Sequence, residues 1–473
     1  MENNSEKLKL SSFSHIFIKG DNVAVYNSLN HKVFYSDKSL LDFLNKFENP
    51  NIFDENSTHI KKLVKAGILV PENFDINVPL IKIRNIIAKP NIDSLYIVTT
   101  DKCNYACKYC FVEENIPSGY RFTSMAGGVL KRGIDLFAHL QLNNGNRESE
   151  VIFYGGEPLL NKNMIFLGTE YLNEKVDTGE IKKLNKMIFT NGSLVTRDVA
   201  KFFYEQKISV GISIDGWKEI HDKMRVYSAT NKGTFESTIK GYKNLKRAGC
   251  HIGISCTVSS HNIDVLDKVI EYFATELEGK FISLNPLFDI SNKEKITKEF
   301  LEHMADKIIE AYDIAKQYGI YEDRVTKFIE PFVKGFIRVV DCTGCGRQMV
   351  LSPDGQIGTC HAFLGNKKFF CGSVYSNKFD PNKNKVFVEW SKRSPFNMPQ
   401  CQNCPALSIC GGGCPYNAYV RKGSIWALDD RICYLAKGIL EKIIWEGFEN
   451  VKRKNKREGP NKTSEKKLRH FGC

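Results

Sequence analysis

The chain has 473 residues, of which 42% are hydrophobic and 26% charged, with 15 cysteines and a formal net charge of +13. This length and composition predict a globular protein of about three domains. They exclude a membrane-spanning or secreted chain, because no uninterrupted apolar run approaches bilayer length and the N-terminus lacks an apolar signal core. We therefore expect a cytoplasmic protein, whose clustered cysteines bind metal rather than form disulfides.

Residues 1–85 begin with three short strand-like runs, which two short helical patterns and the candidate helix C-cap Gly67 follow. The runs are 15–19, 23–27 and 32–35, and the helical patterns are 38–46 and 57–66. This order predicts a small winged-helix-like domain. It resembles the precursor-recognition domain of peptide-modifying enzymes, in which a leader peptide adds a strand to a sheet edge. A structural cap on the next domain is the alternative.

Strand-like and helical stretches alternate from about residue 90 to 320. The expected strands are 94–99, 150–154, 186–190, 209–214, 251–258 and 280–284, and clear helical patterns include 234–248, 263–277 and 298–318. Such βα repetition predicts a parallel sheet. Six units predict an α/β fold, a partial (β/α)6 TIM-like barrel with its chemistry at the C-terminal ends of the strands.

Three cysteines directly follow the first of these strands. Cys103, Cys107 and Cys110 have the spacing C-x3-C-x2-C, with the aromatic Phe111 next in the chain. Three thiolates can hold three irons of a [4Fe-4S] cluster and leave the fourth iron open. A zinc site is the alternative, but it usually needs four protein ligands. The triplet resembles the signature of the radical S-adenosylmethionine (SAM) enzymes.

Later strands end in motifs that resemble the same family. Tyr154-Gly-Gly-Glu-Pro158 resembles the GGEP motif, in which glycines allow close backbone approach and a carboxylate accepts hydrogen bonds from the SAM amino group. Ser213-Ile-Asp-Gly216, followed by His221 and Arg225, resembles the stretch that contacts the ribose and carboxylate of SAM. Arg225 suits a carboxylate because its guanidinium can bind in a bidentate way, whereas we expect Asp215 and His221 to be structural. The resemblance implies the SAM-binding residues Gly155, Gly156, Glu157, Pro158, Asn191, Ser213 and Arg225.

A cysteine-rich region covers residues 325–445. Its spacing is Cys345-x9-Gly355-x4-Cys360, then Cys401-x2-Cys404-x5-Cys410-x3-Cys414, then Cys433. This arrangement resembles the seven-cysteine SPASM domain, which holds two auxiliary [4Fe-4S] clusters, so that the resemblance implies three clusters in all; a zinc site over 401–414 is the alternative. By that resemblance the first auxiliary cluster has Cys345, Cys360 and Cys414 as ligands, and the second has Cys401, Cys404, Cys410 and Cys433.

Cys342 lies three residues before Cys345 and is the expected fourth ligand of the first auxiliary cluster. If it does not bind, the open iron could take a substrate thiolate. Cys250, Cys256 and Cys371 are expected to pack in the core, although Cys371 could also be an accessory ligand or a catalytic thiol.

The residue after Cys360 bears on the reaction. Sulfatase-maturing relatives generally have an aspartate base there, whereas this chain has His361, which resembles the thioether-forming maturases of cysteine-rich peptides, the sactipeptide and ranthipeptide group. We expect a 5′-deoxyadenosyl radical to abstract hydrogen from a precursor peptide and a peptide cysteine to bond to that carbon. His361 is the candidate base, or else only a hydrogen-bonding neighbour.

Alternatives to thioether formation are carbon–carbon crosslinking, epimerisation, sulfatase maturation and, in another class, a non-catalytic iron–sulfur or zinc protein that binds peptides. The expected partners are a precursor peptide with a leader sequence and an electron donor such as flavodoxin or ferredoxin.

The positive charge gathers at the C-terminal end. Lys452 to His470 holds nine Lys or Arg against two acidic residues. This composition predicts a basic, disordered tail over 446–473 rather than a nucleic-acid site.

Overall fold

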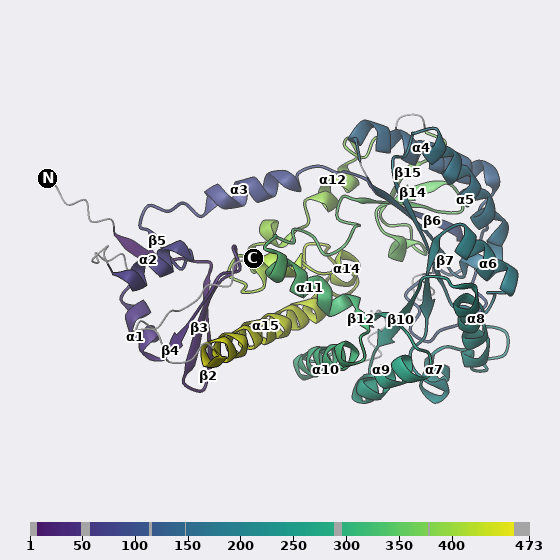
Figure 1. Ribbon diagram of the computed structural model, residues 1–473. Coiled ribbons are helices and arrows are strands. Elements are labelled where there is room, and N and C mark those ends of the chain that lie inside the picture. The colour runs from purple at the N-terminus through teal and green to yellow at the C-terminus, as the bar shows by residue number, and fades with distance from the viewer. Residues whose placement is uncertain are drawn as a thin grey trace.

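The computed structural model describes residues 7–48, 57–112, 116–146, 148–287, 296–376 and 379–457. Figure 1 shows a small N-terminal domain set apart from a large α/β domain, with the long helix α15 (Asp430–Arg457) running between them. Within the described residues, no helix is both long and apolar enough to cross a membrane.

The N-terminal domain is built on a three-stranded antiparallel sheet, in the order β2-β3-β4. Its elements are β1 (Leu8–Leu10), β2 (Ser14–Lys19), β3 (Asn22–Asn27), β4 (Val33–Asp37), α1 (Ser39–Asn45), α2 (Thr58–Lys65) and β5 (Leu69–Pro71), with β1 and β5 paired to each other. The side chains of β3 alternate between the two faces of this sheet, and both faces are covered. Val23 and Val25 pack in the domain's own core, whereas Ala24 and Tyr26 join the core of the large domain.

The large domain contains one ten-stranded sheet, in the order β12-β11-β10-β9-β8-β7-β6-β13-β14-β15. The parallel strands are β6 (Ser94–Thr100), β7 (Ser149–Gly155), β8 (Leu184–Thr190), β9 (Ile208–Ser213), β10 (Ile252–Val258), β11 (Phe281–Pro286), β12 (Tyr321–Glu322) and β13 (Gln348–Leu351); β14 (Gln356–Gly358) and β15 (Phe370–Ser373) are antiparallel. All six predicted strands are confirmed, and the α/β class with them.

The helices of the large domain follow the strands in chain order. They are α4 (Gly127–Asn144), α5 (Lys162–Asp177), α6 (Arg197–Glu205), α7 (Lys218–Met224), α8 (Phe235–Ala248), α9 (Leu266–Thr275), α10 (Lys298–Gln317) and α11 (Asp323–Lys334). The linker helix α3 (Asn77–Ile86) precedes them, and α12 (Lys385–Ser391), α13 (Leu407–Cys410) and α14 (Pro415–Lys422) lie in the cysteine-rich region. Short 3-10 turns occur at Pro158–Asn161, Ile263–Val265, His361–Phe363, Pro395–Asn397 and Pro399–Cys401.

The two faces of the barrel sheet differ in chemistry. Residues paired in a parallel register share a face, and the face beneath the helices is apolar, with Ile212 and Ile254 buried. The opposite, inner face is aromatic over β6 to β8, where Tyr154 lies 5.9 Å from Tyr96 and 6.0 Å from Phe189 between ring centroids. Over β9 to β11 the inner face is polar, with Ser213, Ser255 and Ser283 side by side.

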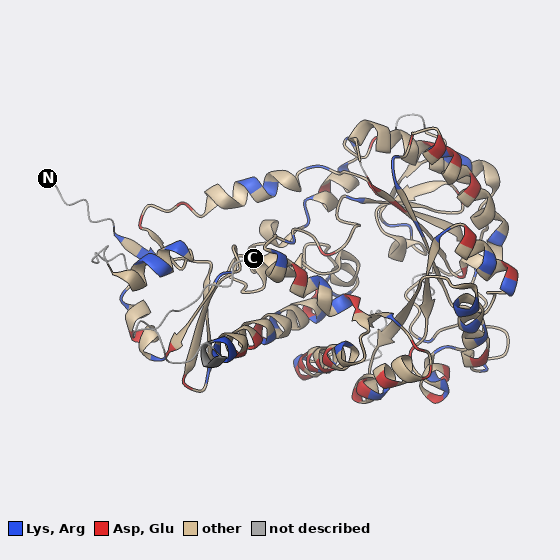
Figure 2. Ribbon diagram, viewed as in Figure 1, with Lys and Arg blue, Asp and Glu red and all other residues tan. Residues whose placement is uncertain are grey.

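The predicted disordered tail begins too early in the chain, because residues 446–457 are helical. Helix α15 continues through residues 446–457 because its apolar face packs on the core, with Ile443 and Ile444 buried and Phe448 and Val451 packed against them. Lys452, Arg453 and Lys454 therefore lie on a helix, and Figure 2 shows the basic residues gathered at that end of α15. The remaining tail, 458–473, lies outside the described residues.

Candidate active site and cysteine clusters

The first cysteine loop is pinned to the segment that follows α7. Ala106 donates its amide to the carbonyl of Val226 at 2.8 Å, and Lys108 donates to that of Met224 at 2.9 Å. Desolvation by the surrounding chain raises the pKa of Cys103, and the nearby Glu157, Cys107 and Cys110 raise it further. The three cysteines of the predicted SAM cluster therefore lie on one fixed loop at the C-terminal end of β6.

Gly155 and Gly156 bring β7 against this loop. A Cβ on Gly155, whose φ is +150°, would lie 2.1 Å from the carbonyl oxygen of Thr100, and one on Gly156 would lie 2.2 Å from that of Lys102. Only glycine fits at such distances from a backbone. The next amide, that of Glu157, donates to the Lys102 carbonyl at 2.8 Å and so continues the same contact.

The carboxylate of Glu157 is fully buried and holds the neighbouring strand ends together. It accepts hydrogen bonds from the amide of Asn191 (2.8 Å), the hydroxyl of Thr190 (2.7 Å) and the amide of Leu159 (3.1 Å). Burial raises the pKa of Glu157 to about 7, although these three donors oppose the shift. The structure thus gives this carboxylate an organising role that the sequence did not predict, and Pro158 follows it as the buried first residue of a 3-10 turn.

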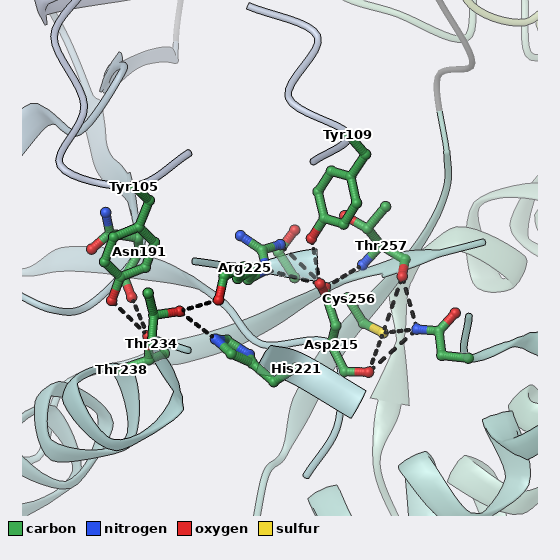
Figure 3. A network of polar contacts seen from close by, with 12 residues as sticks. Tyr105, Tyr109, Asn191, Asp215, His221, Arg225, Thr234, Thr238, Cys256 and Thr257 are labelled. Carbon is green, nitrogen blue, oxygen red and sulfur yellow. Dashed lines mark hydrogen bonds and ion pairs between the residues drawn. The ribbon is translucent and has the colours of Figure 1, made fainter. Parts of the chain in front are cut away.

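Asn191 links the cysteine loop to the end of β8. Its amide group donates to Asn104 Oδ1 at 2.9 Å, and its own Oδ1 accepts from the amide (3.0 Å) and hydroxyl (2.7 Å) of Ser193. Thr238 donates to the Asn191 carbonyl at 2.9 Å and also contacts the hydroxyl of Tyr105 at 3.1 Å. Figure 3 shows Asn191, Thr238 and Tyr105 of this chain of polar contacts.

Arg225 forms a buried ion pair with Asp215. Its Nε and Nη2 lie 2.9 and 3.1 Å from the two carboxylate oxygens, which also accept from the hydroxyl of Tyr109 and, at 3.0 Å, from the amide of Thr257. Figure 3 shows Asp215 at the centre of this network. The bidentate edge that the sequence assigned to the SAM carboxylate is therefore engaged by Asp215, because a fully buried carboxylate requires a counter-charge. Nη1 lies outside that pair.

Two further predictions concern the end of β9. Ser213 lies on the polar inner face, half-buried, at the position expected for a SAM contact. The structural role expected for His221 agrees with its full burial and its 3.1 Å contact to the hydroxyl of Thr234.

Four cysteines of the C-terminal region form a first auxiliary group. Burial raises the pKa of Cys342 to about 12, with Cys345 the next contributor, and burial raises that of Cys414 to about 12, with Cys342 next. Cys360 is likewise raised by burial and then by Cys342, Cys414 and Cys345. Cys342 thus lies among the three ligands implied by the SPASM resemblance.

The other four form a second auxiliary group. Burial raises the pKa of Cys433 to about 12, with further contributions from Cys401 and Cys404, and it raises that of Cys410, with Cys433 the next contributor. These contributions link the four thiols to one another, and the partition of the eight cysteines into two clusters stays a prediction.

All described cysteines are free thiols. Among the described residues, no three His, Cys, Asp or Glu side chains converge tightly enough to ligate one metal ion. A [4Fe-4S] cluster takes thiolates on separate irons, and the thiol groups supply donors of that chemistry.

His361 lies between the SAM site and the first auxiliary group. Its ring stacks on Tyr96 with centroids 4.7 Å apart and contacts Tyr154 at 4.5 Å. The ring of Phe111, the residue after Cys110, lies 6.2 Å from that of His361, the residue after Cys360, so aromatic side chains connect the two cysteine regions. Burial lowers the pKa of His361 to about 4. Its role, a base or a hydrogen-bonding neighbour, stays a prediction.

Sequence reasoning missed several supporting residues. Asn104 and Tyr109 lie in the loop itself, and their polar side chains between the cysteines were the available signal. The contact of the N-terminal region with the cysteine-rich region was also missed: Phe13, together with Leu80 and Ile83 of the linker helix α3, shares a core cluster with Cys401. Local sequence patterns do not predict contacts between residues so far apart in the chain.

Comparisons with known proteins agree with this geometry. Residues 97–273 match the model of the radical SAM superfamily. Among curated relatives, the radical SAM cyclopropyl synthase TigE of Paramaledivibacter caminithermalis is 24% identical over 93% of this chain and 96% of its own. The cysteine-type anaerobic sulfatase-maturating enzyme of Clostridium perfringens is 28% identical over 69% of this chain and 89% of its own.

Two solved structures share the fold. The structure of anSMEcpe with bound AdoMet has a TM-score of 0.63 at 22% identity and covers 76% of this chain and 98% of its own. SuiB of Streptococcus suis, bound to precursor peptide SuiA, has a TM-score of 0.52 at 17% identity and covers 90% of this chain and 99% of its own. With the cysteine loop and the motifs on β7 and β9, the family match makes residues 97–273 a radical SAM domain, in a chain similar to a cyclopropyl synthase and to sulfatase-maturating enzymes.

Proposed function

We propose that this chain is a radical SAM maturase that modifies a ribosomally made precursor peptide and forms thioether bonds from peptide cysteines to carbon. The observation that carries the proposal is the aromatic wall of Tyr96, Tyr154 and His361, which lies between the SAM-cluster thiols and the first auxiliary group. A peptide carbon bound there would be near both the radical source and an electron acceptor.

Different residues of the chain have different roles in the proposed reaction. When bound, SAM and a reduced [4Fe-4S] cluster supply a 5′-deoxyadenosyl radical that removes one hydrogen atom from the peptide. Cys103, Cys107 and Cys110 hold the cluster, while the Asp215–Arg225 pair and the Asn191 network fix the loop that carries them. Three aromatic side chains, Tyr96, Tyr154 and Phe189, cover the inner face of the barrel over β6 to β8 and exclude water from it.

Three clusters complete the proposal. The first auxiliary group has four thiols, Cys342 included, so it would hold a cluster without an open iron. Thioether formation removes a hydrogen atom from carbon, a proton from the thiol and one electron, and the two auxiliary groups are the proposed route for that electron. A reduced flavodoxin or ferredoxin is the proposed donor for the SAM cluster.

The N-terminal domain is the proposed binding site for the leader of the precursor. Its sheet is antiparallel with β2 and β4 at the edges, as strand addition requires. One comparison supports a peptide substrate: the fold of SuiB, which covers 90% of this chain, is known in a complex with the precursor peptide SuiA.

Co-expression with a short cysteine-rich peptide from the neighbouring reading frame tests the reaction. We expect each crosslink to remove two hydrogens and to protect one cysteine from alkylation, as read by mass spectrometry. The Cys110→Ala variant should leave the peptide unmodified, and Cys371→Ser, which alters a cysteine outside the three groups, should act as the wild type. An unchanged peptide mass, or zinc in place of iron in anaerobically reconstituted protein, would refute the proposal.

Carbon–carbon bond formation within the peptide is the second candidate. The match to TigE, a cyclopropyl synthase, covers more of the chain than the match to the sulfatase-maturating enzyme. The same experiment separates these reactions. Loss of two hydrogens with every cysteine still alkylated indicates a carbon–carbon bond, whereas an aldehyde in place of a cysteine or serine side chain indicates sulfatase-type maturation.

A further inference from the structure

Arg393 is a fully buried cation in the middle of the cysteine-rich region. Its guanidinium donates to three backbone carbonyls: Nε to Ile425, Nη1 to Gly413 at 2.9 Å and Nη2 to Ala427 at 3.3 Å. Gly413 directly precedes Cys414 of the first auxiliary group. Three carbonyls fix the position of the guanidinium but leave its charge uncompensated.

The chain that joins the two auxiliary groups lies over this guanidinium. Gly411, Gly412 and Gly413 connect Cys410 of the second group to Cys414 of the first, with φ values of +71°, +87° and +70°. A Cβ on Gly412 would lie 3.5 Å from Nη1 of Arg393 and 3.0 Å from Pro395. The glycine run thus allows the backbone to pass directly beside the cation.

Within the described part of the chain, no ion pair includes Arg393. The nearby Asp429 pairs with Arg431 at 2.8 Å, although the charge of Arg393 also contributes to lowering the pKa of Asp429. The guanidinium binds the carbonyl of Gly413, the residue before Cys414, and lies beside the glycine run that joins the two cysteine groups. A buried cation without a counter-ion is strongly unfavourable, so the thiolate groups on its two sides are its natural counter-charge.

We propose that Arg393 is a positioning residue that raises the reduction potentials of both auxiliary clusters by holding one buried positive charge between them. This inference rests on the proposed pair of auxiliary clusters. Reduction adds one negative charge to a cluster, and a fixed cation in a medium of low polarity stabilises that state. Because Nη1 of Arg393 lies 2.9 Å from the carbonyl of Gly413, the residue before Cys414, the effect is larger on the first cluster.

Redox titration of the full-length protein tests the proposal. Cys103, Cys107 and Cys110 are replaced by alanine, so that only the auxiliary clusters contribute to the electron paramagnetic resonance signal, and the protein is reconstituted anaerobically. Arg393→Gln should shift the midpoint of the first cluster to lower potential, and that of the second by less in the same direction. Arg393→Lys keeps the charge and should stay near the wild-type potentials.

A second variant keeps the test valid if Arg393→Gln does not fold. Asp429→Asn removes an anion whose oxygen accepts the Cys414 amide at 3.1 Å and should raise the potential of the first cluster. Unchanged potentials in either loaded variant, or equal shifts for Gln and Lys at position 393, would overturn the inference. Absence of auxiliary iron–sulfur signals in the parent protein would refute the cluster assignment instead.

Discussion

The buried pair of Asp215 and Arg225 provides the sharpest test of how the SAM site is held. The exposed fractions of these side chains are 0% and 8%, and the carboxylate accepts four hydrogen bonds from Arg225, Tyr109 and the Thr257 amide. Asp215→Asn keeps the shape but leaves Arg225 buried without a counter-charge. Breaking such a pair on one side costs about 3–5 kcal/mol.

The loss of stability should be local to the ion pair, at the ends of β9 and β10. If the free energy of local opening falls by this amount, amide hydrogen exchange accelerates by roughly two to four orders of magnitude. We expect this acceleration at neutral pH in peptides covering Ile252–Val258, measured by mass spectrometry on the anaerobic holoprotein. Weaker SAM binding should accompany it, because Tyr109 in the cysteine loop loses its charged partner.

The pH dependence has a defined sign. Burial alone would raise the pKa of Asp215, but Arg225 outweighs burial and holds it below its usual value. A carboxyl group with a lowered pKa contributes stability above its unfolded pKa and loses it as the pH falls through the folded pKa. The wild type should therefore lose protection of β10 in acid, and Asp215→Asn should lack that transition.

Two controls make the test decisive. Glu205→Gln breaks an exposed ion pair to Lys201, 3.7 Å long, and should change exchange by less than about 1 kcal/mol. The double variant Asp215→Asn with Arg225→Met removes both charges and should recover part of the loss. Exchange in Asp215→Asn within tenfold of the wild type, or fully additive losses in the double variant, would contradict the reasoning.

Three further predictions address the clusters and the strand ends. Gly156→Ala places a Cβ 2.2 Å from a backbone oxygen of the cysteine loop and should lower the iron content by one cluster. Gly128→Ala, with nothing within 4 Å of its Cβ, should leave the iron content unchanged. Equal iron content in the two variants would contradict the argument that only glycine fits at position 156. Cys342→Ser should change the shape of the first auxiliary signal in electron paramagnetic resonance, because one iron loses its thiolate while three remain held, and Cys371→Ser should leave it unchanged. An unchanged signal in Cys342→Ser would show that this thiol is not a ligand. Burial raises the pKa of Glu322 to about 7, so the stability linked to its protonation is complete below about pH 4.5 and is lost as the pH rises through about 7. The amount is roughly 3 kcal/mol; the melting temperature should fall over that range in the wild type and stay flatter in Glu322→Gln, and equal slopes would refute the shift.

Local patterns predicted the barrel strands well because each strand carries its own signal. The stretch Ser94–Thr100, for example, is a short apolar run rich in β-branched residues and is followed by polar residues, which suffices to indicate a buried parallel strand. Helix α15 shows where such reasoning fails: its C-terminal turns are highly charged, and only the packing of Phe448 and Val451 on distant elements keeps them helical. Strand β12 was missed because two residues carry no periodicity.

The cysteine spacing by itself predicted a three-thiol loop at the end of a strand and eight further thiols that divide four and four, because the separation of ligands along the chain is a property of the sequence. Tertiary structure alone decided what surrounds them: Asp215 on Arg225, the carboxylate of Glu157 on the amide of Asn191, Tyr154 against the ring of His361, and Arg393 on the carbonyl of Gly413. The physical reason is that burial and counter-charge are properties of residues brought together from distant parts of the chain, and these properties, rather than spacing, set protonation, position and potential.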